Sequence, residues 1–137
     1  MRMIVGGAYQ GKRAYAVHNY GIREDEITDG AVLPLEKLCA RPEEGGTGAG
    51  RFQCISNFHL VIKRLLEEGR DPMEVLQRFL AENTEVVIIM DEVGNGIIPL
   101  ERSERIWREQ VGRCGCFLAA RAECVDRVVC GLAVRIK

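Results

Sequence analysis

The sequence predicts an α/β domain in which helices flank a mainly parallel sheet and a pair of short strands closes the chain. Three observations favour this class. Segments of strand and helix character alternate, a glycine-rich turn follows the first strand, and a wholly apolar run at residues 86–90 is typical of a central strand buried on both faces. The 137 residues are enough for one hydrophobic core, so we expect a single domain over residues 1–137.

The first predicted strand, Arg2–Val5, runs directly into the glycine-rich turn. The residues of the turn are Gly6, Gly7, Ala8, Tyr9, Gln10, Gly11, Lys12 and Arg13, which match the phosphate-binding P-loop pattern G-x-x-x-x-G-K-[ST] except at its last position. In a P-loop the backbone amides point at phosphate oxygens, and the lysine reaches the β- and γ-phosphates. We therefore expect these eight residues to bind a nucleoside triphosphate, in a P-loop domain of the RecA-like type.

A helix over Lys12–Tyr20, ended by Gly21, is expected after the turn. Its N-terminus would add a partial positive charge to the phosphate site. The P-loop pattern carries a hydroxyl at position 13 that ligates Mg²⁺, whereas the guanidinium of Arg13 cannot ligate a cation. The sequence therefore predicts a phosphate site with a weakened metal site.

Two carboxylates, Asp91 and Glu92, follow the apolar run. Open α/β sheets bind ligands at the carboxyl ends of their strands, so we expect both side chains near the phosphates. In P-loop proteins an acidic residue at this place holds Mg²⁺, usually through water, or orients the attacking group. The predicted catalytic residues are Lys12 on the phosphates, Asp91 as the metal ligand, and Glu92 on the metal or as a general base. An acidic strand end without chemistry is the alternative, and the nearby P-loop makes it less favoured.

The middle of the chain has weaker patterns. A short strand is expected at Glu26–Thr28, and the apolar residues between Val32 and Leu38 fit no element clearly. Residues 40–50 are rich in glycine and predict a flexible surface loop. A second phosphate cradle is less favoured there, because no clear strand precedes the glycines and no lysine follows them. A buried strand is expected at Phe52–Ile55.

Three helices and a final strand pair are predicted in the second half. The first helix is capped by Ser56 or Asn57 and ends at Gly69, and the second is capped by Asp71, with Pro72 at its first helical position. The third is a long helix from about Leu100 to Glu123. Two strands are expected around Gly131. His59 lies on the outer side of the apolar stripe of the first of these helices. We therefore expect a surface or interface histidine rather than a catalytic one.

Charge and cysteine content exclude several function classes. Nineteen basic and twenty acidic residues give a net charge of −1, which argues against nucleic acid and against an anionic membrane as partners. No apolar run has the length of a membrane span or the character of a signal peptide, so the cytoplasm is the expected location. The six cysteines form no C-x-x-C pair, and we expect reduced thiols packed as small apolar residues.

The segment from Asp91 to Pro99 reads D-E-V-G-N-G-I-I-P. It resembles the signature E-V-G-x-G-I-V-P of the bifunctional adenosylcobinamide kinase/adenosylcobinamide-phosphate guanylyltransferase family of cobalamin biosynthesis. The similarity continues through the long helix and into the C-terminal V-V-C-G-L-A-V-R-I-K, which is similar to the family's closing V-V-x-G-L-P-L-x-I-K. With the Gly6–Lys12 turn, the resemblance covers both ends of the chain.

The resemblance implies a P-loop α/β fold assembled as a trimer. It also implies Mg²⁺ with ATP or GTP as the phosphate donor, and an adenosylcobinamide-like corrinoid whose aminopropanol hydroxyl is phosphorylated. The family then transfers GMP from GTP through a guanylylated histidine. This chain keeps Arg41-Pro42 of that region but has no histidine between His18 and His59, so the resemblance implies that the guanylyltransferase activity has been lost.

Gln53 stands where the family usually carries Asp or Glu, so a second metal-binding oxygen is missing. Three functions remain open. The favoured one is a shortened adenosylcobinamide kinase, and the second is a catalytically silent module of the same fold that binds a nucleotide or corrinoid. A generic P-loop nucleotide kinase is least favoured, because the sequence has no obvious arginine-rich lid.

Overall fold

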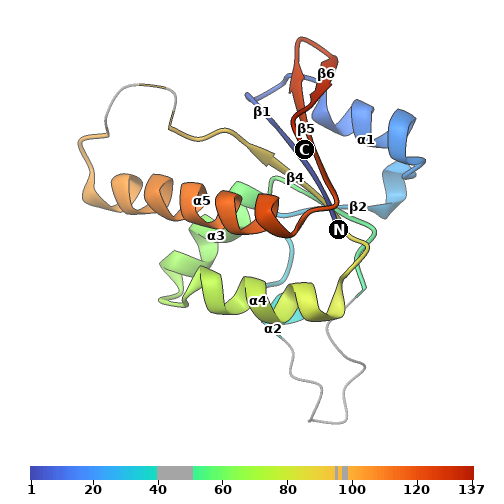
Figure 1. Ribbon diagram of the computed structural model, residues 1–137. Helices are drawn as coiled ribbons and strands as arrows, with labels where there is room; N and C mark the ends of the chain where they lie inside the picture. Colours follow the sequence, from blue (N-terminus) through green and yellow to red (C-terminus); the bar gives the residue numbers. More distant parts are fainter. Residues whose placement is uncertain (40–50, 95, 97–98) are drawn as a thin grey trace.

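The computed structural model describes residues 1–39, 51–94, 96 and 99–137, and it contains a six-stranded sheet with helices on both faces (Figure 1). The strands are β1 (Arg2–Gly6), β2 (Ile27–Asp29), β3 (Cys54–Ser56), β4 (Val87–Asp91), β5 (Cys124–Val129) and β6 (Leu132–Arg135). They lie in the order β2-β3-β4-β1-β5-β6, with β6 antiparallel to β5 and every other pairing parallel. The predicted mainly parallel sheet with a C-terminal strand pair is confirmed.

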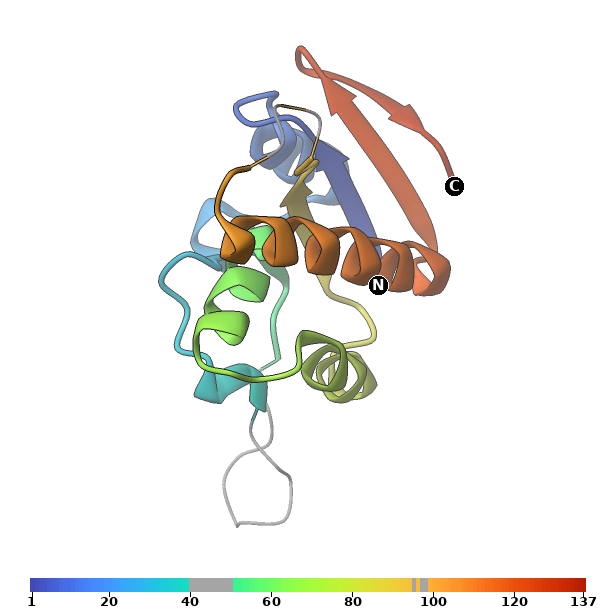
Figure 2. The same ribbon diagram turned by 90° about the vertical axis from the view of Figure 1, so that its left-hand side faces the viewer.

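Helices cover the two faces unequally. They are α1 (Lys12–Tyr20), α2 (Glu36–Cys39), α3 (Phe58–Glu67), α4 (Pro72–Glu82) and α5 (Arg102–Arg121), with a 3₁₀ turn η1 at Glu24–Glu26. Helix α1 packs on one face, and α3, α4 and α5 pack on the other, with α5 crossing in front of the sheet in Figure 2. The glycine-rich loop predicted over residues 40–50 lies outside the described residues, as do residues 95, 97 and 98 of the signature segment.

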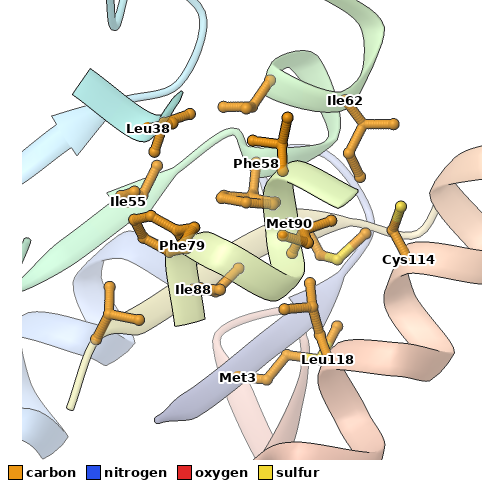
Figure 3. Close-up of a cluster of buried hydrophobic side chains, with 14 of the residues drawn as sticks. Met3, Leu38, Ile55, Phe58, Ile62, Phe79, Ile88, Met90, Cys114 and Leu118 are labelled. Atoms are coloured by element: carbon orange, nitrogen blue, oxygen red, sulfur yellow. The ribbon is translucent and has the colours of Figure 1, made fainter. Parts of the chain in front are cut away.

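Strand β4 shows why an apolar run folds as a central strand. Ile88 and Met90 point into the larger core with α3, α4 and α5, whereas Val87 and Ile89 point into the core beneath α1. Figure 3 shows the larger core, in which side chains from the sheet and from four helices meet. Because both faces of β4 are buried, its carboxyl end has a fixed position, and that end carries Asp91.

Helix starts are predicted with mixed success. Asp71 caps α4 as predicted, since its Oδ1 accepts a hydrogen bond from the Met73 amide at 2.8 Å and Pro72 takes the first helical position. Asn57 stands at the cap position of α3, but its backbone is left-handed (φ 53°) and its side chain does not cap the helix. The side-chain amide of Asn57 instead donates a hydrogen bond to Asp29 Oδ1 at 2.9 Å, which connects the start of α3 to the end of β2.

Other elements differ from the prediction by a few residues. The unassigned segment after β2 contains the short helix α2 at its end, and its leucines at positions 33, 35 and 38 are buried in the core. The first strand of the C-terminal pair, expected over Arg127–Cys130, is longer than expected, because β5 begins at Cys124 and both Cys124 and Val125 are buried. Cys54, Cys114 and Cys124 are buried as expected, whereas Cys116 and Cys130 are exposed. Within the described part of the chain, none of the helices is long and apolar enough to cross a bilayer.

Candidate functional site

The turn between β1 and α1 has a backbone that glycine permits. Gly6 has φ 152° and approaches β5 so closely that a Cβ there would lie 2.3 Å from the Val128 carbonyl oxygen. Gly11 is left-handed (φ 88°) and takes the N-cap position of α1, where no side chain caps the helix. The N-terminal amides of α1 therefore have no side-chain acceptor from the cap residue, which is the arrangement that suits an anion.

The turn between β5 and β6 braces this loop. The Gly131 amide donates to the Gln10 carbonyl at 3.0 Å, and the Cys130 amide donates to Gln10 Oε1 at 2.5 Å. A Cβ on Gly11 would lie 3.3 Å from the Gly131 Cα, so the two turns are in close contact. Residues far apart in the sequence thus fix the shape of the glycine-rich turn.

Lys12 and Asp91 meet inside the crevice that the turn encloses. The Lys12 side chain is 7% exposed, and its Nζ lies 2.5 Å from the Gly7 carbonyl oxygen and 2.7 Å from Asp91 Oδ1. The Asp91 side chain remains 22% exposed, so the pair faces the crevice. The structure thus brings together two of the three predicted catalytic residues, and their action on a nucleotide stays a prediction.

The crevice has a volume of about 490 Å³. Of the eight predicted nucleotide-binding residues, six line it, namely Ala8, Tyr9, Gln10, Gly11, Lys12 and Arg13. Gly6 and Gly7 shape the turn instead of lining the crevice. The opposite wall comes from the β3–α3 junction and β4, through Ser56, Asn57, His59, Leu60, Ile89 and Asp91.

His59 corrects the sequence-based expectation. It is 7% exposed and lines the crevice, so it is not a surface histidine. Its Nδ1 accepts a hydrogen bond from the Asp91 amide at 3.1 Å, and its Nε2 lies 3.8 Å from Asp91 Oδ2. The helical periodicity predicted an outward-facing ring because it contains no information about β4. The carboxyl end of β4 contacts the first turn of α3 and buries the ring.

Burial lowers the pKa of the His59 imidazole and outweighs the opposite effect of the Asp91 carboxylate, and the positive charge of Lys12 lowers this pKa further. The lowered pKa favours the uncharged ring at neutral pH. Because Nδ1 accepts the Asp91 amide, the ring proton belongs on Nε2, which faces the Asp91 carboxylate.

Glu92, the third predicted catalytic residue, does not join Lys12. Its side chain accepts two hydrogen bonds from the Arg127 guanidinium, at 2.7 and 2.9 Å, and it lines a different hollow beneath α5. Consecutive side chains of an extended segment point to opposite sides, so the side chains of Asp91 and Glu92 diverge at the end of β4. The structure therefore does not bring Glu92 to Lys12 in the crevice, and a catalytic role for Glu92 stays a prediction.

Arg13 lies at the edge of the crevice and forms an exposed ion pair with Glu24, with 2.7 Å between Nε and Oε2. Gln53 immediately precedes β3, and its carbonyl oxygen accepts the Val87 amide at 2.9 Å. Neither residue brings a carboxylate or hydroxyl oxygen to the crevice.

A metal-binding role in the crevice would rest on Asp91. Among residues 1–39, 51–94, 96 and 99–137, no group of three or more His, Cys, Asp or Glu side chains is placed to hold a metal ion. Mg²⁺ that arrives with a nucleotide needs only one or two protein carboxylates, because phosphates and water complete its shell. The donor set therefore fits a nucleotide-borne Mg²⁺ and not a protein-built metal cage.

These features define an α/β domain with a P-loop-type turn at the carboxyl edge of a parallel sheet. A family model described as cobinamide kinase / cobinamide phosphate guanyltransferase (CobU) matches residues 55–136, more than half of the chain. The chain belongs to this family, and the predicted resemblance is confirmed. The match leaves out the glycine-rich turn, so the evidence for a phosphate site comes from the turn's own sequence and geometry.

Two curated relatives agree with the family. They are the bifunctional adenosylcobalamin biosynthesis proteins CobU of Salmonella typhimurium and Escherichia coli, each 46% identical to this chain over 52 residues. The aligned segment covers 38% of this chain and 29% of each relative. The chain therefore matches less than a third of the length of either relative.

Proposed function

We propose that this chain binds ATP or GTP with Mg²⁺ in the Lys12–Asp91 crevice and transfers the γ-phosphoryl group to a corrinoid alcohol, as an adenosylcobinamide kinase of cobalamin biosynthesis. One observation carries the proposal. A buried lysine at the end of a glycine-rich turn shares its ammonium between a loop carbonyl and a carboxylate at the tip of the central strand. Family membership supplies the substrate class.

Each residue has a stated part in this proposal. A polyphosphate would lie against the N-terminal amides of α1, and Lys12 would exchange Asp91 for phosphate oxygens. Asp91 would then hold Mg²⁺, which neutralises charge on the transferring group. The acceptor oxygen would form a bond to the γ-phosphorus, the bond between the γ-phosphorus and the β–γ bridging oxygen would break, and the nucleoside diphosphate would leave with that electron pair. The hydroxyl proton would pass to water. Glu92 has no part in this step, because it is paired with Arg127 in another hollow.

The test is a reaction of purified protein with Mg²⁺, ATP or GTP, and adenosylcobinamide, followed by detection of cobinamide phosphate. We expect product from the wild type and none from Lys12→Ala. Nucleotide affinity should fall about tenfold to hundredfold in Lys12→Ala, because a charged hydrogen bond contributes about 1.5–3 kcal/mol. Lys37→Ala, an exposed lysine on α2, is the matched control and should behave as wild type.

A catalytically silent binding module of the same fold is the second candidate. Arg13 favours it, since this side chain offers no metal-binding oxygen and its guanidinium is bonded to Glu24. Nucleotide binding that depends on Lys12, without cobinamide phosphate, would support the module over the kinase.

We also infer that the guanylyltransferase activity is absent. His18 Nδ1 is bonded to the Ala14 carbonyl on the exposed side of α1, and His59 is buried with Nδ1 bonded to the Asp91 amide. Incubation with labelled GTP should leave no acid-labile label on the protein. A label on His18 or His59 would contradict the inference.

A homotrimer is proposed from the family resemblance. The edge strand β6 supports association, because Leu132 and Val134 are 76% and 64% exposed and Ile136 follows at 59%. Sedimentation equilibrium should give three times the chain mass. A monomer mass at micromolar concentration would contradict it.

A further inference from the structure

His59 is held from two sides, so its ring has one orientation. Its Nδ1 accepts the Asp91 amide at 3.1 Å, and the indole Nε1 of Trp107 donates to the His59 carbonyl at 2.9 Å. The Trp107 ring also lies against the imidazole, with 6.3 Å between ring centroids. A buried polar ring fixed in this way at a crevice wall is costly unless each polar atom has a partner.

The second ring nitrogen faces the Asp91 carboxylate. The protonated Nε2 lies 3.8 Å from Asp91 Oδ2, which is longer than a hydrogen bond and within reach of a small rotation of the carboxylate. At the same time, Lys12 Nζ holds Oδ1 at 2.7 Å. The two carboxylate oxygens therefore have different neighbours: an ammonium on one side and a neutral imidazole on the other.

These two neighbours respond differently to a nucleotide. The Lys12 ammonium ends a flexible side chain, and the lysine of a P-loop binds phosphate oxygens. Nucleotide binding would therefore move this ammonium away from Asp91. His59 cannot follow, because its backbone and ring are fixed by Trp107 and by the Asp91 amide. After the exchange, Asp91 would face the phosphates without its cation, and its orientation would depend on His59.

We propose that His59 is the positioning residue of Asp91: Nδ1 fixes the Asp91 backbone, and the Nε2 proton binds Oδ2 so that Oδ1 is the oxygen left to the metal when Lys12 moves to the phosphates. This inference rests on the proposed nucleotide site. Groups that orient a metal ligand in this way typically change metal affinity by about tenfold to hundredfold. The competing interpretation is that His59 only packs against Trp107.

The experiment compares nucleotide affinity with Mg²⁺ and with EDTA, using a fluorescent ATP or GTP analogue. Three substitutions separate the two ring nitrogens. His59→Leu removes both polar atoms, His59→Asn keeps an acceptor near the place of Nδ1, and His59→Gln keeps a donor near the place of Nε2. Asp91→Asn and Lys12→Ala serve as references, and thermal unfolding reports folding of each variant.

In EDTA we expect the affinities of the three His59 variants to lie within about twofold of one another, because the phosphate contacts of Lys12 and the turn are the same in all three. With Mg²⁺, His59→Leu and His59→Asn should lose about tenfold in affinity, as Asp91→Asn does. His59→Gln should recover most of the loss. His59→Asn should recover thermal stability without recovering the Mg²⁺ effect.

A wild-type Mg²⁺ effect in His59→Leu, or an equal loss in His59→Gln and His59→Asn, would overturn the proposal. So would a wild type whose affinity is the same with Mg²⁺ and with EDTA. Where the leucine variant does not fold, the asparagine and glutamine variants decide alone. An unchanged affinity in Lys12→Ala would instead overturn the nucleotide site itself, so the two failures are distinguishable.

Discussion

The two hollows at the carboxyl edge of the sheet have the same volume, about 490 Å³, and Asp91 lines both of them. They differ in the burial and in the partners of their positively charged side chains. In the P-loop crevice, the buried Lys12 ammonium contacts Asp91 and the Gly7 carbonyl, and we propose that phosphate oxygens replace these contacts. In the hollow beneath α5, the lining is mostly aliphatic and glycine, and the Glu92 carboxylate and Arg127 guanidinium bind each other through two hydrogen bonds. Volume and position at the sheet edge therefore do not separate the two hollows, whereas the burial and pairing of their cations do.

Glycines also serve opposite purposes in the two hollows. Gly6 and Gly11 carry backbone angles and close approaches that other residues do not tolerate. Gly112 and Gly115 lie inside helix α5, and a Cβ on Gly112 would meet no atom within 4 Å. The backbone of the glycine-rich turn requires glycine at Gly6 and Gly11, whereas Gly112 in the hollow beneath α5 leaves space that a side chain could fill.

The largest effect is expected for Gly6→Ala. The new Cβ would lie 2.3 Å from the Val128 carbonyl at φ 152°, so either the turn or β5 must move. Overpacking and backbone strain together should lower the free energy of unfolding by about 3 kcal/mol. Urea unfolding measures this. A loss below about 1 kcal/mol would show that the turn does not approach β5 as described.

The next effect concerns Asp126, which anchors the strand pair that braces the crevice. Its side chain is 1% exposed and bonds to Arg135, Tyr15 and Tyr20. Asp126→Asn should cost about 2 kcal/mol, less than a fully buried pair because Arg135 is half exposed. The crevice should then bind nucleotide more weakly, since Gly131 and Cys130 lose a fixed position.

The same residue predicts a pH dependence. Burial alone would raise the pKa of the Asp126 carboxyl, but hydrogen bonds from Arg135, Tyr20 and Tyr15 bring it below its usual value. A carboxyl with a lowered pKa in the folded state contributes stability above about pH 4, and the contribution disappears as the pH falls through the folded-state pKa. Unfolding curves from about pH 6 to pH 3 should show a smaller loss of stability for Asp126→Asn than for the wild type. Parallel losses would contradict the assignment.

A stabilising change is expected in the other hollow. Gly112→Ala adds a methyl group where nothing lies within 4 Å and replaces a flexible residue inside α5, so stability should rise by about 0.5–1 kcal/mol. Nucleotide affinity should stay within twofold of the wild type. A clear loss of nucleotide affinity would mean that the hollow beneath α5 takes part in binding.

The smallest effect is expected for Arg13→Ser, which restores the hydroxyl of the P-loop pattern. The ion pair with Glu24 that it removes is exposed and contributes little to stability. Nucleotide binding should become more dependent on Mg²⁺, by a few-fold, because the hydroxyl offers a metal-binding oxygen. Arg13→Ala is the matched control without a hydroxyl, and equal Mg²⁺ titrations for both variants would contradict this role of position 13.

The sequence was sufficient to predict the elements whose signals are local. The Arg2–Val5 strand, the Lys12–Tyr20 helix and the Asp71 cap depend on residues within a few positions of each other, and the structure confirms them. The contact of Lys12 with Asp91 was predictable because both follow parallel strands, which end at one edge of the sheet.

The remaining features depend on the packing of distant segments. His59 is buried by β4, and the glycine-rich turn is braced by Cys130 and Gly131, contacts that no spacing in the sequence encodes. Glu92 illustrates a further limit, since its position beside Asp91 suggested one site, whereas strand geometry directs it to Arg127. Alternation at the end of the apolar run was the signal that could have separated the two carboxylates.

The most direct test of the account is an amide NMR titration of the chain with Mg²⁺ and ATP or GTP. It distinguishes the two hollows in one measurement. We expect the amide signals of residues 7–13 and of Asp91 to shift strongly, while those of Gly112 and Gly115 do not change. Shifts confined to Gly112, Gly115 and their neighbours, or no shifts in residues 7–13 at millimolar nucleotide, would contradict it.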